Sequence, residues 1–293
     1  MDKNILVTGI EGFVGSNFAL LAKMNKFKVF GLSRSGANWD EVQYLKNLNV
    51  AAKNIKFECV IHFGAIASTR FIDEEVLYGF NVEAVKLIVN FCSITDTPLI
   101  FISSSAIYGN KNNNLSMYAQ TKKQGELIIN ETPRLRFLIL RLFNTYGFNE
   151  IEKNDMKSII SEMIISGLKD KKISIWQFSD LQLGAQSRDF IYVQDVISII
   201  MSLIITKRYV GETLDLGSGQ SYKFIDIAKH VASIETDILI ESVSPPDTYE
   251  KDFYQQYTCA DMSWIQLVDD IINPRHPFEI IPELIEKYKM IAK

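Results

Sequence analysis

The stretch Ile5-Leu6-Val7-Thr8-Gly9-Ile10-Glu11-Gly12-Phe13-Val14-Gly15 joins an apolar run to an amphipathic segment near the start of the chain. Its glycines are spaced so that the backbone can turn tightly between a strand and a helix and approach a pyrophosphate at the helix N-terminus. A glycine triplet alone can also be a purely structural turn. Because this triplet follows an apolar strand and opens a helix, we predict a dinucleotide-binding loop. Its predicted contacts are Gly9, Gly12, Phe13, Val14 and Gly15.

The rest of the first half alternates short apolar runs with longer segments of helical spacing, which is typical of βαβ units on a parallel sheet. Uniformly apolar strands suit a sheet that helices cover on both faces. We therefore predict an α/β fold, a Rossmann-type doubly wound parallel sheet with a smaller C-terminal substrate-binding domain. The expected strands are residues 4–8, 28–32, 59–63, 99–103 and 137–143, and the expected helices are 16–24, 74–94 and 118–130.

After Gly147 this alternation ends. We expect helices at 155–168, 224–233 and 278–291, a strand at 174–178, and a strand that turns into a helix over 189–205. The chain then crosses back to the sheet at least once. We assign residues 1–147 and about 188–216 to the dinucleotide-binding domain, and about 148–187 and 217–293 to the second domain.

The composition is that of a soluble globular chain: 293 residues, 47% hydrophobic and 23% charged, with a net charge of −4. Such a mild negative charge gives no reason to expect nucleic acid as a partner. The three cysteines and three histidines are scattered without metal-ligand spacing, so we predict no metal site. No secretory signal opens the chain, and the longest apolar stretch, 196–205, is too short to cross a bilayer, so we expect a cytoplasmic protein without membrane contact.

The residues after the second expected strand bear on the form of the cofactor. An acidic residue there would accept hydrogen bonds from the adenosine ribose and disfavour a 2′-phosphate. This chain has Ser33-Arg34-Ser35 instead, and an arginine can clamp a phosphate with two hydrogen bonds. The alternative is a solvated arginine in a turn. We predict that Ser33 and Arg34 contact the cofactor and that NADP is preferred over NAD.

Two motifs carry groups for acid–base chemistry. Tyr118-Ala119-Gln120-Thr121-Lys122 places a phenol and an ammonium four residues apart on one face of a helix. A nearby ammonium lowers the pKa of a phenol, which can then act as acid or base on a hydroxyl. Ile102-Ser103-Ser104-Ser105-Ala106-Ile107-Tyr108-Gly109 ends an apolar strand with hydroxyls able to bind the same oxygen. The Tyr–Lys spacing alone is common, but its combination with the glycine loop, in this order, is specific.

With these motifs the chain resembles the extended short-chain dehydrogenase family, which includes nucleotide-sugar epimerases, dehydratases and 4-keto reductases. Further matches are His62-Phe63-Gly64-Ala65, Asn81, Arg141-Leu142-Phe143-Asn144-Thr145-Tyr146-Gly147 and the segment 188–196. The resemblance implies that Ser104, Tyr118 and Lys122 form the catalytic triad. It also implies cofactor contacts at Phe63, Gly64, Ala65, Tyr118 and Lys122, and substrate contacts at Ser68, Thr69, Ser105, Asn144, Arg188 and Tyr254. The alternative for Asn144 and Arg188 is loop capping and a surface ion pair.

Among the subgroups, the motifs are most similar to those of the ADP-glycero-manno-heptose 6-epimerases. The similarity lies in Gly64-Ala65-Ile66-Ala67-Ser68-Thr69, in Lys153 and in residues 254–261. It implies that Lys153 is a second acid/base group, although a solvated lysine is an equally good interpretation. Several features depart from the pattern: the Ser104–Tyr118 interval is short, Phe148-Asn149 replaces Pro-Arg, and residues 181–186 do not match. Ser105-Ala106 stands where dehydratases have an acidic pair, so we expect no dehydration.

We therefore expect an NAD(P)-dependent epimerase that acts on a nucleotide-diphosphate sugar through a transient ketone. The alternative is an NADPH-dependent 4-keto-sugar reductase, favoured by Arg34 and the short Ser104–Tyr118 interval. A third hypothesis, a non-catalytic NAD(P)-sensing module, would need no phenol–ammonium pair. We also expect a homodimer built on helices 74–94 and 118–130. Their apolar residues Val85, Ile88, Val89 and Cys92 suggest more apolar surface than one sheet face needs.

Overall fold

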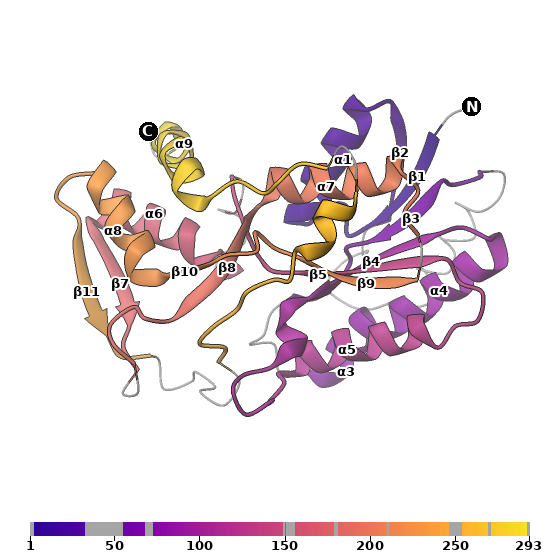
Figure 1. The fold of residues 1–293 in the computed structure, drawn as a ribbon, viewed down its shortest axis with the longest axis horizontal. Coiled ribbons are helices and arrows are strands. Elements are labelled where there is room, and N and C mark those ends of the chain that lie inside the picture. Colours follow the sequence, from indigo (N-terminus) through magenta and orange to yellow (C-terminus); the bar gives the residue numbers. More distant parts are fainter. Residues whose placement is uncertain are drawn as a thin grey trace. The chain divides into compact units, whose positions relative to one another are not determined.

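The computed structural model describes residues 3–32, 55–67, 73–148, 150, 156–178, 181–209, 211–245, 254–268 and 271–291. The chain divides into two compact units (Figure 1). The first unit consists of Met1–Gly109, Leu115–Leu142 and Ile197–Asp215. The second consists of Asn110–Asn114, Phe143–Val196 and Leu216–Lys293. The segment 188–196, which we expected with the dinucleotide-binding domain, groups with the second unit.

The first unit is built on a six-stranded sheet of order β2-β1-β3-β4-β5-β9. The first five strands in this order are parallel, and Ile5 pairs with Val29 on one side and Cys59 on the other. The strand order reverses beside β1, and ligands of such sheets bind at this point, beyond the carboxyl ends of the strands. The strands are β1 (Lys3–Thr8), β2 (Phe27–Leu32), β3 (Cys59–His62), β4 (Leu99–Ser104), β5 (Phe137–Leu142) and β9 (Glu212–Leu216).

Helices cover both faces of this sheet (Figure 1). On one face lie α1 (Phe13–Met24) and α7 (Val193–Ile205), and on the other lie α3 (Glu74–Tyr78), α4 (Ala84–Thr95) and α5 (Met117–Asn130). A π-helical turn, η1 (Gly79–Glu83), joins α3 to α4 without a break. Among the described residues, Glu74–Thr95 is the one helical run long and apolar enough to span a membrane, but most of it is buried, as in a core helix of a soluble protein.

The side chains on which the expected dimer rested are inside the first unit. Val85, Ile88, Val89 and Cys92 belong to the core cluster of α4 with strands β1, β3, β4 and β5. They are at most 6% exposed, so they offer no apolar surface to a partner, and the argument from them was wrong. Exposed apolar side chains on the same two helices are Ile94 and Leu127, at 76% and 52%. The homodimer itself stays a prediction.

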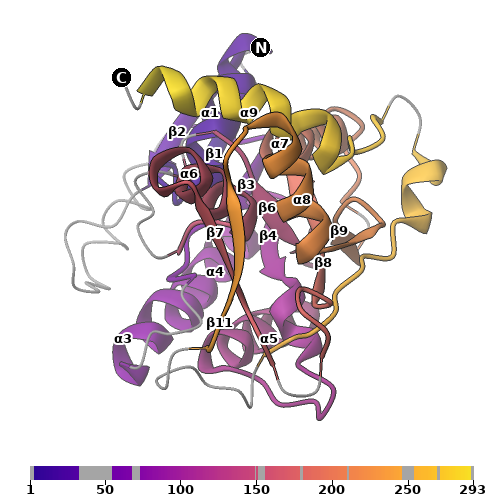
Figure 2. The same ribbon diagram turned by 90° about the vertical axis from the view of Figure 1, so that its left-hand side faces the viewer.

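The second unit contains two small sheets and three helices that pack on one another (Figure 2). In the three-stranded sheet, β8 is parallel to β6 and antiparallel to β10, and β7 pairs in parallel with β11. We did not predict β6, β10 or β11, which are short or partly polar. The strands are β6 (Asn144–Tyr146), β7 (Lys172–Trp176), β8 (Ser187–Tyr192), β10 (Ser221–Lys223) and β11 (Leu239–Val243); the helices are α6 (Ile159–Asp170), α8 (Phe224–Ile234) and α9 (Pro277–Ile291), with a 3-10 turn η5 (Ser263–Leu267).

Capping residues account for the differences between the expected and observed helix starts. α6 begins at Ile159 rather than at 155, because the Ser158 hydroxyl accepts a hydrogen bond from the Ser161 amide at 3.2 Å. α1 begins at Phe13 rather than at 16, because Gly12 is its N-cap residue. Helical periodicity locates the buried face of a helix well, and the cap decides where the helix starts.

Candidate active site

The loop between β1 and α1 packs closely on itself at its glycines. Gly9 has a φ of +67°, and a Cβ there would lie 2.7 Å from the amide nitrogen of Gly64. A Cβ on Gly15 would lie 2.2 Å from the carbonyl oxygen of Gly9, and one on Gly12 would lie 3.2 Å from the same oxygen. These neighbours are backbone atoms, which cannot move aside without displacing the loop. Glycine is therefore required at Gly9 and Gly15 for the loop to form.

The same loop presents the N-terminus of α1. Gly12 caps the helix in an extended conformation without a capping side chain, and the first turn contains no acidic residue. Amide groups at a helix N-terminus and the helix dipole both favour a bound anion. The close backbone approach at the glycines and this uncharged helix start fit the pyrophosphate of a dinucleotide. Gly12, Phe13 and Val14 would then hold it.

Hydrogen bonds connect the end of β1 to the residues that follow β3. The hydroxyl of Thr8 is 2.7 Å from Nδ1 of His62 and accepts a hydrogen bond from the amide of Gly64 at 3.2 Å. Phe63, next in the chain, packs its ring against Phe18 of α1 at 5.7 Å between centroids. The predicted segment 63–65 therefore lies directly beside the glycine loop.

Tyr118 and Ser104 form the centre of the predicted catalytic triad, and the Ser104 side chain is close enough to the phenol to affect its pKa. Tyr118 lies in the first turn of α5, which Ser116 caps by accepting a hydrogen bond from the Ala119 amide at 3.3 Å. Burial raises the pKa of Tyr118, and the side chain of Ser104 opposes that effect. We expected Lys122 to lower this pKa; in the structure burial dominates and Ser104 provides the opposing contribution.

Lys122 lies one turn further along α5 and is 3% exposed. Its ammonium donates a hydrogen bond to the carbonyl of Ile102 at 2.7 Å and lies 4.9 Å from the centre of the Phe101 ring. Burial lowers the pKa of Lys122 to about 7, against the opposing charge of Glu126. A lysine held in this way can change its charge near neutral pH, which is typical of functional sites. The structure therefore brings Ser104, Tyr118 and Lys122 to the same strand end, as predicted.

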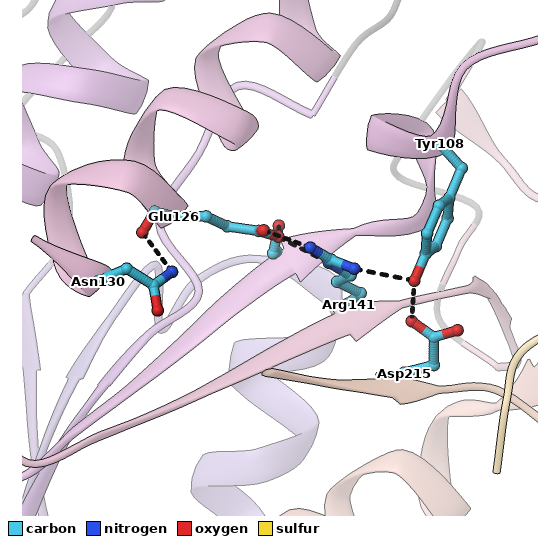
Figure 3. A network of polar contacts seen from close by, with 6 residues as sticks. Tyr108, Glu126, Asn130, Arg141 and Asp215 are labelled. Atoms are coloured by element: carbon cyan, nitrogen blue, oxygen red, sulfur yellow. Dashed lines mark hydrogen bonds and ion pairs between the residues drawn. The ribbon is translucent and has the colours of Figure 1, made fainter. Parts of the chain in front are cut away.

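A chain of polar contacts continues from Glu126, one further turn along α5 (Figure 3). The Glu126 carboxylate accepts hydrogen bonds from Nε and Nη2 of Arg141 at 3.1 and 2.8 Å. The Arg141 guanidinium also donates to the Tyr108 hydroxyl at 3.0 Å, and this hydroxyl donates to Asp215 at 2.6 Å. These residues come from α5, β5, the turn after β4, and β9. Sequence reasoning missed this network, although Tyr118, Lys122 and Glu126 follow one another at intervals of four.

Asn81 supports helix α5 from η1. Its side chain accepts a hydrogen bond from the amide of Ile66 at 2.8 Å and donates to the carbonyl of Ile66 at 3.1 Å. It also donates to the hydroxyl of Thr121 at 3.0 Å, and that hydroxyl donates to the carbonyl of Tyr118 at 2.8 Å. Asn81 thus ties the segment after β3 to the first turn of α5. π-Helical turns are frequent at functional sites, but no pattern in the sequence predicted one here.

In the second unit, Arg188 lies between two aromatic rings. Its guanidinium carbon is 4.8 Å from the centre of the Tyr254 ring and 5.6 Å from that of Phe224. Tyr254 stacks in turn on Phe178 at 4.7 Å. Arg188 is buried, so the alternative of a surface ion pair is wrong. Two of the predicted substrate contacts, Arg188 and Tyr254, are therefore in direct contact.

Asp189 fixes the strand position next to Arg188. Its buried carboxylate accepts hydrogen bonds from the backbone amides of Ser218, Gly219 and Ala260 at 2.6, 2.9 and 3.0 Å. The side-chain amide of Asn144 donates to the carbonyl of Asp189 at 2.8 Å. In this structure Asn144 thus ties β6 to β8. Its contact with substrate stays a prediction.

Ser105 is buried in the 3-10 turn Ser105–Tyr108 that follows β4. The other predicted contacts on substrate and cofactor lie outside the described residues. They are Ser33, Arg34, Ser68, Thr69 and Lys153.

Comparison with known proteins agrees with this geometry. The model of the NAD dependent epimerase/dehydratase family matches residues 5–217. The chain belongs to this family. This confirms the resemblance seen in the motifs, the α/β fold class and the expectation of an enzyme.

Individual relatives cover nearly the whole chain. The ADP-L-glycero-D-manno-heptose-6-epimerase of Brachyspira hyodysenteriae is 27% identical over 88% of this chain and 89% of its own length. MoeE5, solved in complex with UDP-glucose and NAD, has a TM-score of 0.81 at 21% identity, covering 99% of this chain and 100% of that protein. The UDP-N-acetylglucosamine 4-epimerase of Methanobrevibacter ruminantium also has a TM-score of 0.81, at 22% identity and 99% coverage of both chains.

Proposed function

We propose that the chain is an epimerase that acts on a nucleoside-diphosphate sugar through a transient ketone. The observation that carries the proposal is the buried Tyr118 phenol, which lies beside Ser104 and one helical turn before the buried Lys122. The glycine loop at the end of β1 accepts the dinucleotide. The relatives support the reaction class, since two of them are named as epimerases of nucleotide sugars.

In this mechanism the nicotinamide, when bound, supplies the hydride acceptor and donor. Tyr118 removes the proton from the sugar hydroxyl as it becomes a ketone and returns it when the ketone is reduced. Ser104 donates a hydrogen bond to the same oxygen and holds the phenol in line. Lys122, in its charged form, stabilises the phenolate. These groups lie on a strand end and a helix, so their positions are set by the sheet.

The proposal also covers the residues that would bind the nucleotide of the substrate and the form of the cofactor. A nucleoside diphosphate would meet Arg188 and Tyr254 in the second unit, where a guanidinium flanked by rings can bind phosphate and stack on a base. The preference for NADP(H) rests on Arg34 in the sequence, whereas MoeE5 was solved with NAD. Cofactor titration of the Arg34 variant, given in the Discussion, tests this preference.

The test is a screen of nucleotide sugars by mass spectrometry and NMR, with sugars deuterated at each ring or side-chain carbinol carbon in turn. The expected result is an epimer that retains the deuterium, with no net change in cofactor absorbance. Stoichiometric oxidation of NADPH by a keto-sugar substrate would show a reductase instead. The Tyr118→Phe variant is the matched control, because it should lose either activity while the loop still binds the cofactor.

A further inference from the structure

We propose that Glu126 and Arg141 act as a positioning pair for the reaction. Glu126 holds Lys122 in its charged form, and Arg141 limits how strongly it does so. The inference rests on the proposed function in one respect: the proposed reaction is what gives Lys122 a catalytic role. The pair itself is defined by contacts within the first unit, and its effect on Lys122 can be measured without a substrate.

The helical spacing places Glu126 on the reacting face of α5. Tyr118, Lys122 and Glu126 recur at intervals of four, so they follow one another along one side of the helix. All three are buried, at 8%, 3% and 6% exposure. Lys123 and Leu127, the residues directly after Lys122 and Glu126, are exposed. Glu126 is therefore the next side chain behind Lys122 on the buried side, away from Tyr118.

The carboxylate of Glu126 ties this helix to two strand ends. It accepts a hydrogen bond from the hydroxyl of Ser103 at 2.5 Å, and Ser103 directly precedes Ser104 in β4. It also receives the two hydrogen bonds from Arg141 at the end of β5 (Figure 3). Glu126 is buried and the Arg141 side chain is a quarter exposed. Because an ion pair removed from water is often no more stabilising than apolar residues of the same volume, stability alone does not explain the pair. The position of the pair beside Ser104 and Lys122 explains its presence.

The charges around Lys122 show why the pair matters. Within the described part of the chain, Glu126 is the acid that acts on Lys122, and burial opposes it. His62 on β3 is close enough to feel Lys122 but is neutral, since burial and Lys122 lower its pKa to about 3. β4 contributes the Phe101 ring and the Ile102 carbonyl, which carry no net charge. The remaining titratable groups on packed elements are bonded elsewhere: Tyr78 of α3 to Gln124, Glu83 to Lys86, and Tyr108 to Arg141 and Asp215.

Removing the charge of Glu126 and removing the charge of Arg141 should therefore shift the titration of Lys122 in opposite directions. Glu126→Gln removes the negative charge and leaves the Arg141 cation uncompensated, so Lys122 should lose its proton at lower pH. Arg141→Gln leaves the Glu126 charge uncompensated, so Lys122 should keep its proton to higher pH. Two charges about one helical turn apart at a partly screened site shift such an equilibrium by about one pH unit or more.

The experiment follows the ¹³Cε resonance of Lys122 against pH in protein labelled with ¹³C-lysine, assigned with Lys122→Arg. In parallel, the alkaline limb of kcat is measured with the substrate found by the screen. We expect a downward shift of about one pH unit for Glu126→Gln and an upward shift of similar size for Arg141→Gln. Asp215→Asn, at the far end of the same network, is the matched control and should leave the titration in place.

A purely structural pair would give a different pattern. Titrations that move in the same direction in both variants, or that stay in place while kcat falls, would overturn the proposal. If a single variant does not fold, the double variant Glu126→Gln/Arg141→Gln leaves no unpaired charge, and its titration should lie within about half a pH unit of the wild type. A larger shift in the double variant would equally contradict the proposal. Failure to find any sugar-nucleotide substrate would affect the proposed function but not the NMR result.

Discussion

Because Lys122 is buried, we predict that it lowers the free energy of unfolding of the wild-type chain. A lysine pKa of about 7 in place of 10.5 means that the folded state binds its proton less tightly than the unfolded state does. Between these two pH values the unfolded chain carries more protons, so stability rises with pH. Replacing Lys122 with methionine, which has a similar shape and no charge, should remove both the cost and its pH dependence.

The size of the effect follows from this pKa difference. At pH 6 the wild type bears a cost of roughly 5 kcal/mol, and at pH 9 roughly 2 kcal/mol. Lys122→Met also leaves the Ile102 carbonyl without its 2.7 Å hydrogen bond, a loss of about 1–3 kcal/mol. The variant should therefore be more stable than the wild type by about 2–4 kcal/mol at pH 6. That advantage should shrink by roughly 3 kcal/mol at pH 9, whatever the exact cost of the lost hydrogen bond.

Guanidinium denaturation followed by circular dichroism at pH 6, 7.5 and 9 measures these differences. Lys123→Met is the matched control, because Lys123 is the exposed neighbour on the same helix and should show no such pH dependence. The Lys122→Met enzyme should at the same time lose its turnover. A variant that is less stable than the wild type by the same amount at every pH would refute the reasoning that Lys122 is buried at a cost.

Four further predictions follow from the site and the sequence. Tyr118→Phe should lower turnover by on the order of 10²–10⁴ while cofactor binding stays within a few-fold, and near-normal turnover would remove Tyr118 from the mechanism. Arg34→Ala should weaken NADPH binding much more than NADH binding in a fluorescence titration, and equal losses would end the case for NADP. Lys153→Ala should stop epimerisation yet allow one-way oxidation or reduction through Tyr118, because only an epimerase needs proton delivery on both faces; epimerisation at the wild-type rate would contradict this. Light scattering should give twice the chain mass of 33.4 kDa, and the mass of a single chain at micromolar concentration would count against the homodimer.

The sequence predicted the first unit well because its signals are local. A buried parallel strand is a short apolar run, and five of the six strands in the large sheet have this form. The sixth, β9, contains Glu212, Thr213 and Asp215, so its composition did not predict a strand. In the second unit, β7 and β8 were expected, whereas β6, β10 and β11 were missed because they are short or partly polar. Their register depends on long-range ties such as Asn144 to Asp189, which no local pattern reveals.

The candidate site likewise contains residues that the sequence predicted and residues that it did not. Gly9, Gly15, Tyr118 and Lys122 could be found because each lies in a motif of fixed spacing. Long-range hydrogen bonds support them: Asn81 of η1 reaches Ile66 and Thr121, and Thr8 at the end of β1 reaches His62. The electrostatics could not be predicted either, because burial depends on the whole fold. That is why we expected the pKa of Tyr118 to be lowered, whereas the structure raises it.

The cost of burying Lys122 also argues against a chain that only senses a dinucleotide. A sensing module needs the glycine loop, but it gains nothing from an ammonium that is 3% exposed and poised to lose its proton. Methionine at this position would keep the packing, and apolar residues could replace the partly buried Glu126–Arg141 pair at little cost. The chain instead keeps the lysine, the acid that favours its charge, and the Ser104–Tyr118 pair at the same strand end. A lysine that is buried at a cost to stability one helical turn after Tyr118 is explained by proton transfer at this site, and hence by catalysis.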